Sequence, residues 1–265
     1  MEIDAVLRLM QDVAAKVITP RFRSLDEGQI AEKKPGDLVT VADREAEVLI
    51  TRALREAYPD AVILGEEASH VDPDLLHRYA AAPHAFTVDP IDGTKNFVKG
   101  SPDHAVMVGE VRDGRAVRAW IWQPQHELAY VAESGAGAYR NGVRLTRVHP
   151  DPASLRGVTS YRRWIGTALG DLPPMELTWV CCGVDYPQLV QGAADYIVYR
   201  GTAPWDHVPG SLLLHEAGAF LGTFDGAEYA PQMPSPRGLV AAADRATFDL
   251  VTGLLPVVGV ADPSG

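Results

Sequence analysis

The stretch Val88-Asp89-Pro90-Ile91-Asp92-Gly93-Thr94 is the most informative part of this 265-residue sequence. It continues the apolar run 85–88, which is typical of a short strand, so Asp89 stands where that strand is expected to end. Rigid scaffolds commonly present functional groups at such positions. Gly93 and Thr94, next to the acidic turn, can offer backbone N–H groups to a phosphate oxygen.

Further carboxylates also occur at the ends of predicted elements. Glu66 and Glu67 follow the apolar run 61–64, and Asp206 stands at the start of a predicted helix. Oxygen ligands without histidine or cysteine partners suit a hard cation, and Mg²⁺ usually takes a few carboxylates together with water and substrate phosphate. Each fragment alone also has a structural interpretation, as a turn, a helix N-cap or a solvated corner.

The composition narrows the class of protein. A net charge of -11, with 46% hydrophobic and 22% charged residues, is typical of an ordinary globular protein and argues against nucleic-acid or acidic-membrane partners. An acidic enzyme that handles phosphate esters needs bound cations to reverse the local field. The only cysteines, Cys181 and Cys182, are adjacent and are expected to be buried structural thiols. Without a signal peptide or an apolar run of about 18 residues, we expect a cytoplasmic location.

The first half of the chain is predicted to be α+β. An amphipathic helix over 3–18 stops at Pro20, the polar stretch 26–36 is expected to be a mobile loop, and a second helix covers 42–57. An antiparallel meander follows over 104–145. Its predicted parts are the strands 104–111, 116–122 and 128–132, with tight turns at Asp113-Gly114 and Asn141-Gly142.

After Pro150 the pattern changes to alternating strands and helices, which favours an α/β lobe. We therefore predict an α+β lobe over 1–148, with most metal ligands, and an α/β lobe over 149–265, with Asp206 and substrate-specificity residues. The tail from Pro256 is expected to fray. The elements predicted for the second lobe are strands 178–182 and 196–199 and helices 187–193 and 208–217.

Taken together, these fragments resemble the inositol monophosphatase family, a branch of the lithium-sensitive, magnesium-dependent sugar phosphatases. Four stretches carry the resemblance, in family order and at family-like spacing: 36–43 (GDLVTVAD), 63–67 (ILGEE), 88–97 (VDPIDGTKNF) and 205–206 (WD) with 216–219 (EAGA) behind it. The resemblance implies a layered αβαβα sandwich, usually assembled as a homodimer. It also implies phosphomonoesterase activity on a small phosphorylated metabolite, with two to three Mg²⁺ ions per site.

The resemblance also implies roles for individual residues. A first magnesium is expected on Glu66, Asp89 and the Ile91 carbonyl, and a third, weaker ion beside Glu66. A second is expected on Asp89, Asp92 and Asp206, with Asp89 bridging. Thr94 and Asp43 resemble the pair that orients and deprotonates the attacking water, and Glu66 is counted as catalytic with them. The implied substrate-binding residues are Asp92, Gly93, Thr94, Gly183, Tyr199, Arg200 and Asp206.

The substrate is less constrained, because the chain departs from the inositol enzymes. Where many of them carry Gly-Ser-Ala-Ala, we match Gly183-Val184-Asp185-Tyr186, and Tyr199 replaces a glutamate that binds inositol hydroxyls. Lys95 after Thr94 also occurs in relatives that act on histidinol phosphate. Arg200 and the cluster 161–163 are candidates for an anionic or polyol contact, or for surface or dimer contacts. The alternatives are a histidinol-phosphate, fructose-1,6-bisphosphate or nucleotide 3'-phosphate phosphatase, and a non-enzymatic regulatory or assembly partner.

Overall fold

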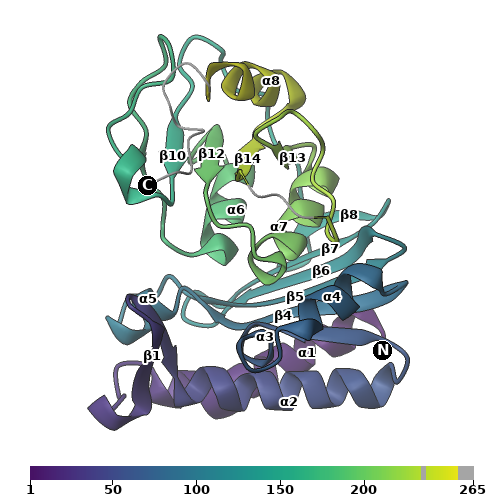
Figure 1. The fold of residues 1–265 in the computed structure, drawn as a ribbon. Helices are drawn as coiled ribbons and strands as arrows, with labels where there is room; N and C mark the ends of the chain where they lie inside the picture. The colour runs from purple at the N-terminus through teal and green to yellow at the C-terminus, as the bar shows by residue number, and fades with distance from the viewer. Residues whose placement is uncertain (234–236, 256–265) are drawn as a thin grey trace.

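The elements of the chain stack in five layers (Figure 1) in a computed structural model that describes residues 1–233 and 237–255. From bottom to top in that view lie α1 and α2, a seven-stranded sheet, α6 and α7, a five-stranded sheet, and α8. The predicted layered αβαβα sandwich is therefore confirmed. The helices of these layers are α1 (Ile3–Val13), α2 (Val41–Ala57), α6 (Cys182–Val190), α7 (Pro204–Ala217) and α8 (Arg245–Leu254).

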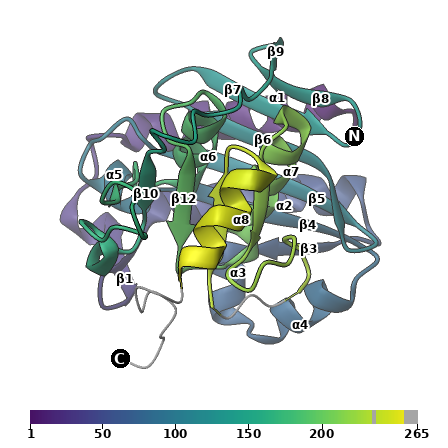
Figure 2. The same ribbon diagram turned by 90° about the horizontal axis from the view of Figure 1, so that it is seen from above.

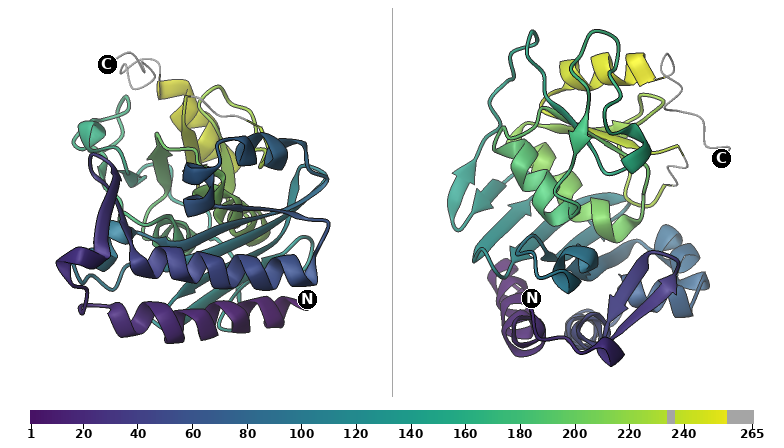
Figure 3. Two further views of the ribbon diagram at one scale, coloured as in Figure 1. Left: turned by 60° about the horizontal axis from the view of Figure 1, so that its bottom comes forward. Right: turned by 90° about the vertical axis from the view of Figure 1, so that its left-hand side faces the viewer.

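The two N-terminal helices lie side by side beneath the first sheet (Figure 3, left). The predicted helix over 3–18 is confirmed, although α1 passes into a π-helical turn at Ala14–Ile18 and a 3-10 turn at Thr19–Arg21. Pro20 lies within that last turn rather than after it. The side chain of Thr40 caps α2 by accepting the backbone N–H groups of Ala42 and Asp43. This cap fixes the first turn of α2, which contains Asp43.

The seven-stranded sheet has the order β3-β4-β5-β6-β7-β8-β9. Only β3 and β4 are parallel, and the rest form the predicted antiparallel meander. Both predicted tight turns place two successive residues at positive φ, Asp113-Gly114 at 48° and 77° and Asn141-Gly142 at 48° and 79°. The strands are β3 (Val62–Gly65), β4 (His84–Asp92), β5 (Ala105–Arg112), β6 (Arg115–Gln123), β7 (Leu128–Glu133), β8 (Gly137–Arg140) and β9 (Val143–Leu145).

The five-stranded sheet is mixed and has the order β11-β10-β12-β14-β13. The predicted strand 196–199 is confirmed as β12. The predicted strand 178–182 is wrong, because Val180 takes a φ of 59° and Cys182 already opens α6. The strands are β10 (Gly157–Thr159), β11 (Glu176–Leu177), β12 (Tyr196–Tyr199), β13 (Phe220–Thr223) and β14 (Leu239–Ala242).

Both helices predicted for the second half begin earlier than expected. α6 starts at Cys182 rather than at 187 and continues past Pro187. Pro187 has no N–H for the Gly183 carbonyl, which instead accepts from Gln123 Nε2 at 2.8 Å, so the cost of an internal proline is offset by a contact with β6. α7 starts at Pro204 rather than at 208, with the proline in its first turn, where a missing N–H costs little.

The polar stretch 26–36, predicted as a mobile loop, contains regular secondary structure. It forms a 3-10 turn at Glu27–Gln29 and the strand β1 (Ile30–Lys34), which turns at Gly36 into β2 (Asp37–Thr40). These two strands pair only with each other among the described residues. Residues 26–36 show no apolar alternation, and β1 has no buried residue, so sequence periodicity carried no signal for this hairpin.

The middle helices lie between the two sheets, where their apolar faces form a core with both (Figure 2; Figure 3, right). α7 packs against β5 and β6 of the first sheet as well as β13 of the second. The predicted lobe division at 148/149 falls between β9 and β10, in the connection between the sheets, and it stays a prediction. The frayed tail predicted from Pro256 lies outside the described residues.

The remaining short helical elements are α3 (Glu66–Val71), α4 (Asp74–Ala81), α5 (Thr94–Val98) and a 3-10 turn at Arg162–Trp164. Within the described ranges, every helix is too short or too polar to cross a bilayer.

Candidate active site

Four acidic side chains predicted as metal ligands come from three separate elements. Glu66 is the first residue of α3, directly after β3, while Asp89 and Asp92 lie near the end of β4. Asp206 comes from the first turn of α7, more than a hundred residues later. One carboxylate oxygen each from Asp89, Asp92 and Asp206 lies within 4.8 Å of the others. The fold thus assembles a carboxylate cluster that the sequence presents only as fragments.

Burial and mutual repulsion make this cluster electrostatically costly. Burial raises the pKa of Asp89 well above its usual range, and the neighbouring Glu66, Asp92 and Asp206 raise it further. Burial and the charge of Asp92 likewise raise the pKa of Asp206. Burial raises the pKa of Asp92 to about 6, although its hydrogen bond from Gly183 opposes that shift. Closely spaced carboxylate oxygens that repel one another are the donor set of a hard divalent cation, so these residues fit a metal centre.

A break in the β4–β5 pairing shapes the acidic turn. The register shifts between Asp89 and Asp92, which frees the intervening backbone from the ladder. The Ile91 N–H donates to Asp89 Oδ1 at 3.1 Å, and the Ile91 carbonyl accepts from Thr94 Oγ1 at 3.0 Å. Gly93 then takes a φ of 80° and leads into α5. The turn therefore holds the Asp89 carboxylate, the Ile91 carbonyl and the Thr94 hydroxyl within one compact loop.

Asp43 and Thr94 lie together, as predicted for the pair that handles water. Thr94 Oγ1 is 3.2 Å from Asp43 Oδ1. The other carboxylate oxygen, Oδ2, accepts the backbone N–H of Thr40 at 2.8 Å and its hydroxyl at 2.5 Å. Burial raises the pKa of Asp43 to about 7 despite these hydrogen bonds. The carboxyl group is thus held by Thr40, and its Oδ1 is directed at Thr94.

The hairpin β1–β2 is attached to the site through Lys33. Lys33 Nζ donates to Glu66 Oε1 at 2.6 Å and to Glu67 Oε1 at 2.8 Å, and its side chain is only 8% exposed. The sequence offered two interpretations of residues 33–36, a loop that closes over the metals or plain surface mobility, and neither named a partner for Lys33. The alternation of polar residues there offered no signal for this contact.

Glu47 is a functional-site neighbour that sequence reasoning missed. Its carboxylate accepts the backbone N–H groups of Glu67 at 2.7 Å and Ala68 at 2.8 Å, so it caps the start of α3. A Cβ at Gly65 would lie 2.4 Å from the Glu47 carboxyl carbon, so this close approach requires glycine. The available signal was a charged residue four positions after Asp43, on the apolar face of a predicted helix.

Two residues that follow β11 in the chain hold the Asp92 carboxylate by hydrogen bonds. Asp92 Oδ2 accepts the Gly183 N–H at 2.5 Å and the thiol of Cys181 at 3.0 Å. Asn96 Nδ2 in α5 donates to the Trp179 carbonyl at 2.8 Å, which fastens this segment to the acidic turn. A β-branched residue at positive φ, here Val180, is a strained position that only surrounding contacts maintain. Sequence matching missed the roles of Cys181 and Asn96 because both contacts cross between distant segments.

The structure places much of the predicted specificity region in the core. Cys181 and Gly183 donate to Asp92, whereas Asp185 and Tyr186 are buried at 1% and 0% exposure. Tyr199 is also buried, at 1%, and its hydroxyl lies 3.4 Å from Asp185 Oδ2. A ring enclosed in this way has no surface to offer a substrate, so Tyr199 is removed from the predicted contacts.

The arginines predicted as substrate contacts are exposed or partly buried. Arg200 is partly buried and donates to the Arg237 carbonyl at 3.3 Å. Arg162 and Arg163 are exposed in the 3-10 turn. Their part in binding a substrate stays a prediction.

A layered sandwich with a buried carboxylate centre at the end of β4 defines this protein as a phosphatase that hydrolyses phosphate monoesters. The chain belongs to the inositol monophosphatase family, whose family model matches residues 1–256. It is 30% identical over 254 residues to an inositol-1-monophosphatase of Mesorhizobium japonicum, covering 86% of this chain and 89% of the relative. It is equally 30% identical over 226 residues to the Nus factor SuhB of Salmonella typhimurium, covering 80% and 82%.

Solved structures share the fold. An IMPase of Thermotoga maritima superposes with a TM-score of 0.80 at 24% identity and covers 98% of both chains. A staphylococcal IMPase-I solved with its products gives a TM-score of 0.82 at 19% identity, covering 97% of this chain and 96% of that one. A dual-specific IMPase/NADP phosphatase bound to D-inositol-1-phosphate gives 0.79 at 20%, covering 97% and 94%.

Proposed function

We propose that this phosphatase is Mg²⁺-dependent and removes phosphate from a small phosphorylated metabolite resembling inositol monophosphate. The observation that carries the proposal is the trio of buried Asp89 and Asp92 with partly buried Asp206, whose oxygens lie within 4.8 Å of one another. Glu66 and the Ile91 carbonyl complete the proposed ligand set, and two to three ions per site are expected. When bound, Mg²⁺ would neutralise the charge of the phosphate ester and lower the pKa of water.

The protein's own groups would position the reactants. The Thr94 hydroxyl, held between Asp43 and the Ile91 carbonyl, would orient a water molecule. Asp43 would accept a proton from Thr94 or from that water, since its Oδ1 has only Thr94 as a hydrogen-bond partner among the described residues. The N–H groups of Gly93 and Thr94 would contact phosphate oxygens. Water would attack in line with the leaving alcohol, as in other phosphoryl transfers.

A phosphate-release screen tests this function. Purified protein with millimolar MgCl₂ is assayed against inositol phosphates, histidinol phosphate, fructose bisphosphate, phosphoadenosine phosphate and NADP. Asp89→Asn and Asp206→Asn should each remove most activity and leave the circular dichroism spectrum unchanged. No release from any member of the panel, or full activity in both variants, would contradict the proposal. Lithium inhibition, measured in the same assay, is expected from the family.

A non-enzymatic role is the second candidate, because one group of relatives carries the name Nus factor SuhB. The chain would then act as a regulatory or assembly partner that retains the fold. A stable complex isolated with the wild type and still formed by Asp89→Ala would support this role, while loss of the complex in that variant would tie it to the metal site.

The homodimer implied by the resemblance and the cytoplasmic location expected from the sequence are also proposed. Analytical ultracentrifugation should give about twice the chain's 28.6 kDa, and cell fractionation would test the location.

A further inference from the structure

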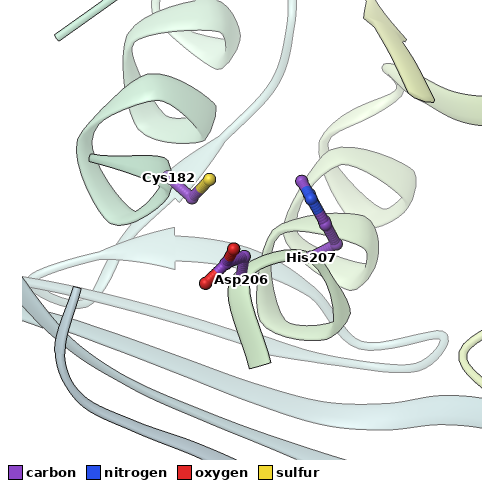
Figure 4. Close-up of side chains that lie close together, drawn as sticks. All are labelled: Cys182, Asp206 and His207. Carbon is purple, nitrogen blue, oxygen red and sulfur yellow. The ribbon is translucent and has the colours of Figure 1, made fainter. Parts of the chain in front are cut away.

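A second group of potential metal ligands lies where α6 and α7 meet. Cys182 opens α6, and Asp206 and His207 come from the first turn of α7. One sulfur, one carboxylate oxygen and one ring nitrogen from these residues lie within 4.8 Å of one another. Figure 4 shows the three side chains facing one shared space between the two helices. Asp206 belongs both to this group and to the carboxylate trio.

Two hydrogen bonds fix the ring of His207 and determine which of its nitrogens carries the hydrogen. Its Nε2 lies 2.9 Å from the Gly201 carbonyl oxygen, which can only accept, so Nε2 carries the hydrogen of the neutral ring. Nδ1 therefore holds the lone pair, and it accepts the Tyr186 hydroxyl at 2.6 Å. Metal-binding histidines usually donate their second N–H to a carbonyl or carboxylate in this way.

The thiol of Cys182 is also available. Cys181 Sγ is buried and contacts Asp92, but Cys182 is only partly buried and its sulfur makes no hydrogen bond within residues 1–233 and 237–255. A thiolate, an imidazole and a carboxylate form a donor set for zinc-class ions and not for Mg²⁺, which prefers oxygen ligands alone. Metal–ligand distances of about 2.0–2.3 Å require the three groups to close by roughly an ångström.

We propose that Cys182, Asp206 and His207 bind a thiophilic divalent cation, such as Zn²⁺ or Cd²⁺. Binding converts the Cys182 thiol to a metal thiolate and releases its proton to solvent, and the Tyr186 hydroxyl leaves Nδ1. The ion withdraws an Asp206 oxygen from Asp89 and Asp92, so it inhibits the phosphatase even when Mg²⁺ is in excess. Only this inhibition rests on the proposed function, because the binding itself does not depend on it.

Cadmium binding gives a direct readout. Wild-type protein in excess MgCl₂ is titrated with CdCl₂, and the ultraviolet thiolate-to-cadmium charge-transfer band is recorded. We expect a band that saturates at one ion per chain. Cys182→Ser should abolish it, and the matched Cys181→Ser should retain it. His207→Gln should weaken binding at least about tenfold, since even outer contacts of metal ligands are worth about 10- to 100-fold. Tyr186→Phe frees Nδ1 and should tighten binding.

The variants distinguish binding at the proposed site from cadmium binding elsewhere in the chain. The absence of a band, a band lost in Cys181→Ser but kept in Cys182→Ser, or unchanged binding in His207→Gln would each overturn the proposal. Activity with Mg²⁺ alone should be the same in Cys182→Ser as in wild type, and ZnCl₂ should inhibit only the wild type. Cadmium binding at Cys182 without inhibition would contradict the proposed withdrawal of Asp206 from the carboxylate trio, whereas the role of Asp206 in catalysis is tested separately by Asp206→Asn.

Discussion

At the scale of single residues, most of the chemistry lies in a few oxygen atoms whose neighbours determine what they can do. Asp43 and Thr94 illustrate this. The carboxylate of Asp43 would be an ordinary helix-start acid if Thr40 did not occupy one oxygen and Thr94 the other. Its burial raises its pKa to about 7, which suits a group that exchanges protons near neutrality.

Removal of the Thr94 hydroxyl tests this pair directly. Thr94→Ala should lower kcat about 100- to 1,000-fold, because water loses its orienting partner while the carboxylate trio stays intact. Thr94→Ser keeps the hydroxyl and should retain activity within about tenfold. Steady-state phosphate release gives kcat for both variants, and thermal unfolding checks that the fold is unchanged. Equal losses in the two variants would show that the hydroxyl has no part in the reaction.

At the scale of elements, the hairpin β1–β2 depends on a distant contact for its place over the site. An isolated two-stranded hairpin is only marginally stable in water. The ion pairs from Lys33 to Glu66 and Glu67 add stability that the pairing of two strands lacks. They contribute more than surface ion pairs because all three side chains are at most 15% exposed.

Loss of the Lys33 charge should therefore loosen the hairpin locally. Without divalent cations, Lys33→Met should speed amide hydrogen exchange over residues 30–40 about 10- to 100-fold, because each hydrogen bond to a charged group contributes about 1.5–3 kcal/mol. The matched Lys34→Met should have little effect, since that side chain is 73% exposed and its Nζ lies 3.7 Å from Asp37. Mass spectrometry of peptides from the hairpin measures both. Unchanged exchange in Lys33→Met would show that the hairpin is stable without these ion pairs.

The connection between α5 and β5 contains an acid-sensitive element. His104 is fully buried between the rings of Phe22 and Phe97, with centroids 5.2 and 5.0 Å away. Burial lowers the pKa of His104 to about 4, and nearby His126 lowers it further while Asp103 opposes the shift. Below about pH 6.5 the unfolded chain binds a proton here that the folded chain does not, down to about pH 4.

The free energy of unfolding should consequently fall as the pH drops from about 6.5 to 4, by up to about 3 kcal/mol from this group. His104→Phe preserves the ring packing and cannot titrate, so its stability should decline less over the same range. Urea unfolding at several pH values measures the difference between the two proteins. His207 is present in both and cancels from that difference. Parallel pH profiles would mean that His104 is not the sensitive group.

At the scale of the whole molecule, the two sheets are joined by the α6–α7 layer. Its packing is tight at Gly210, where an added Cβ would meet the Tyr186 ring at 2.0 Å. Because α7 contacts both sheets, strain here affects the entire chain rather than one lobe.

Gly210→Ala should lower the stability of the whole protein by about 1–3 kcal/mol, because overpacking forces the ring or the helices to move. The same change at Gly253, in α8 with nothing within 4 Å, should instead stabilise by up to about 1 kcal/mol. Differential scanning calorimetry should show a lower Tm for the first variant and a slightly higher one for the second. A second, separate transition in Gly210→Ala would indicate that the lobes unfold independently.

The acidic turn, the tight hairpin turns and most of the strands could be predicted from the sequence because each depends on short-range rules. Examples are the positive φ at Asn141-Gly142, the apolar run before Asp89 and the periodicity of α2. The family resemblance added the αβαβα layers. These parts follow from local conformational preference and from motifs that remain contiguous in the chain.

Only the tertiary structure decided which distant groups meet. Lys33 reaches Glu66, Cys181 and Gly183 hold Asp92, and Tyr199 turns into the core, although nothing near each residue specifies its partner. Cys182 likewise joins His207 only because α6 and α7 pack together. Such contacts depend on how whole layers pack, and the packed surfaces come from segments that are far apart in the chain. For that reason, the acidic residues of the candidate site could be predicted from the sequence, whereas the contacts that surround them could be seen only in the tertiary structure.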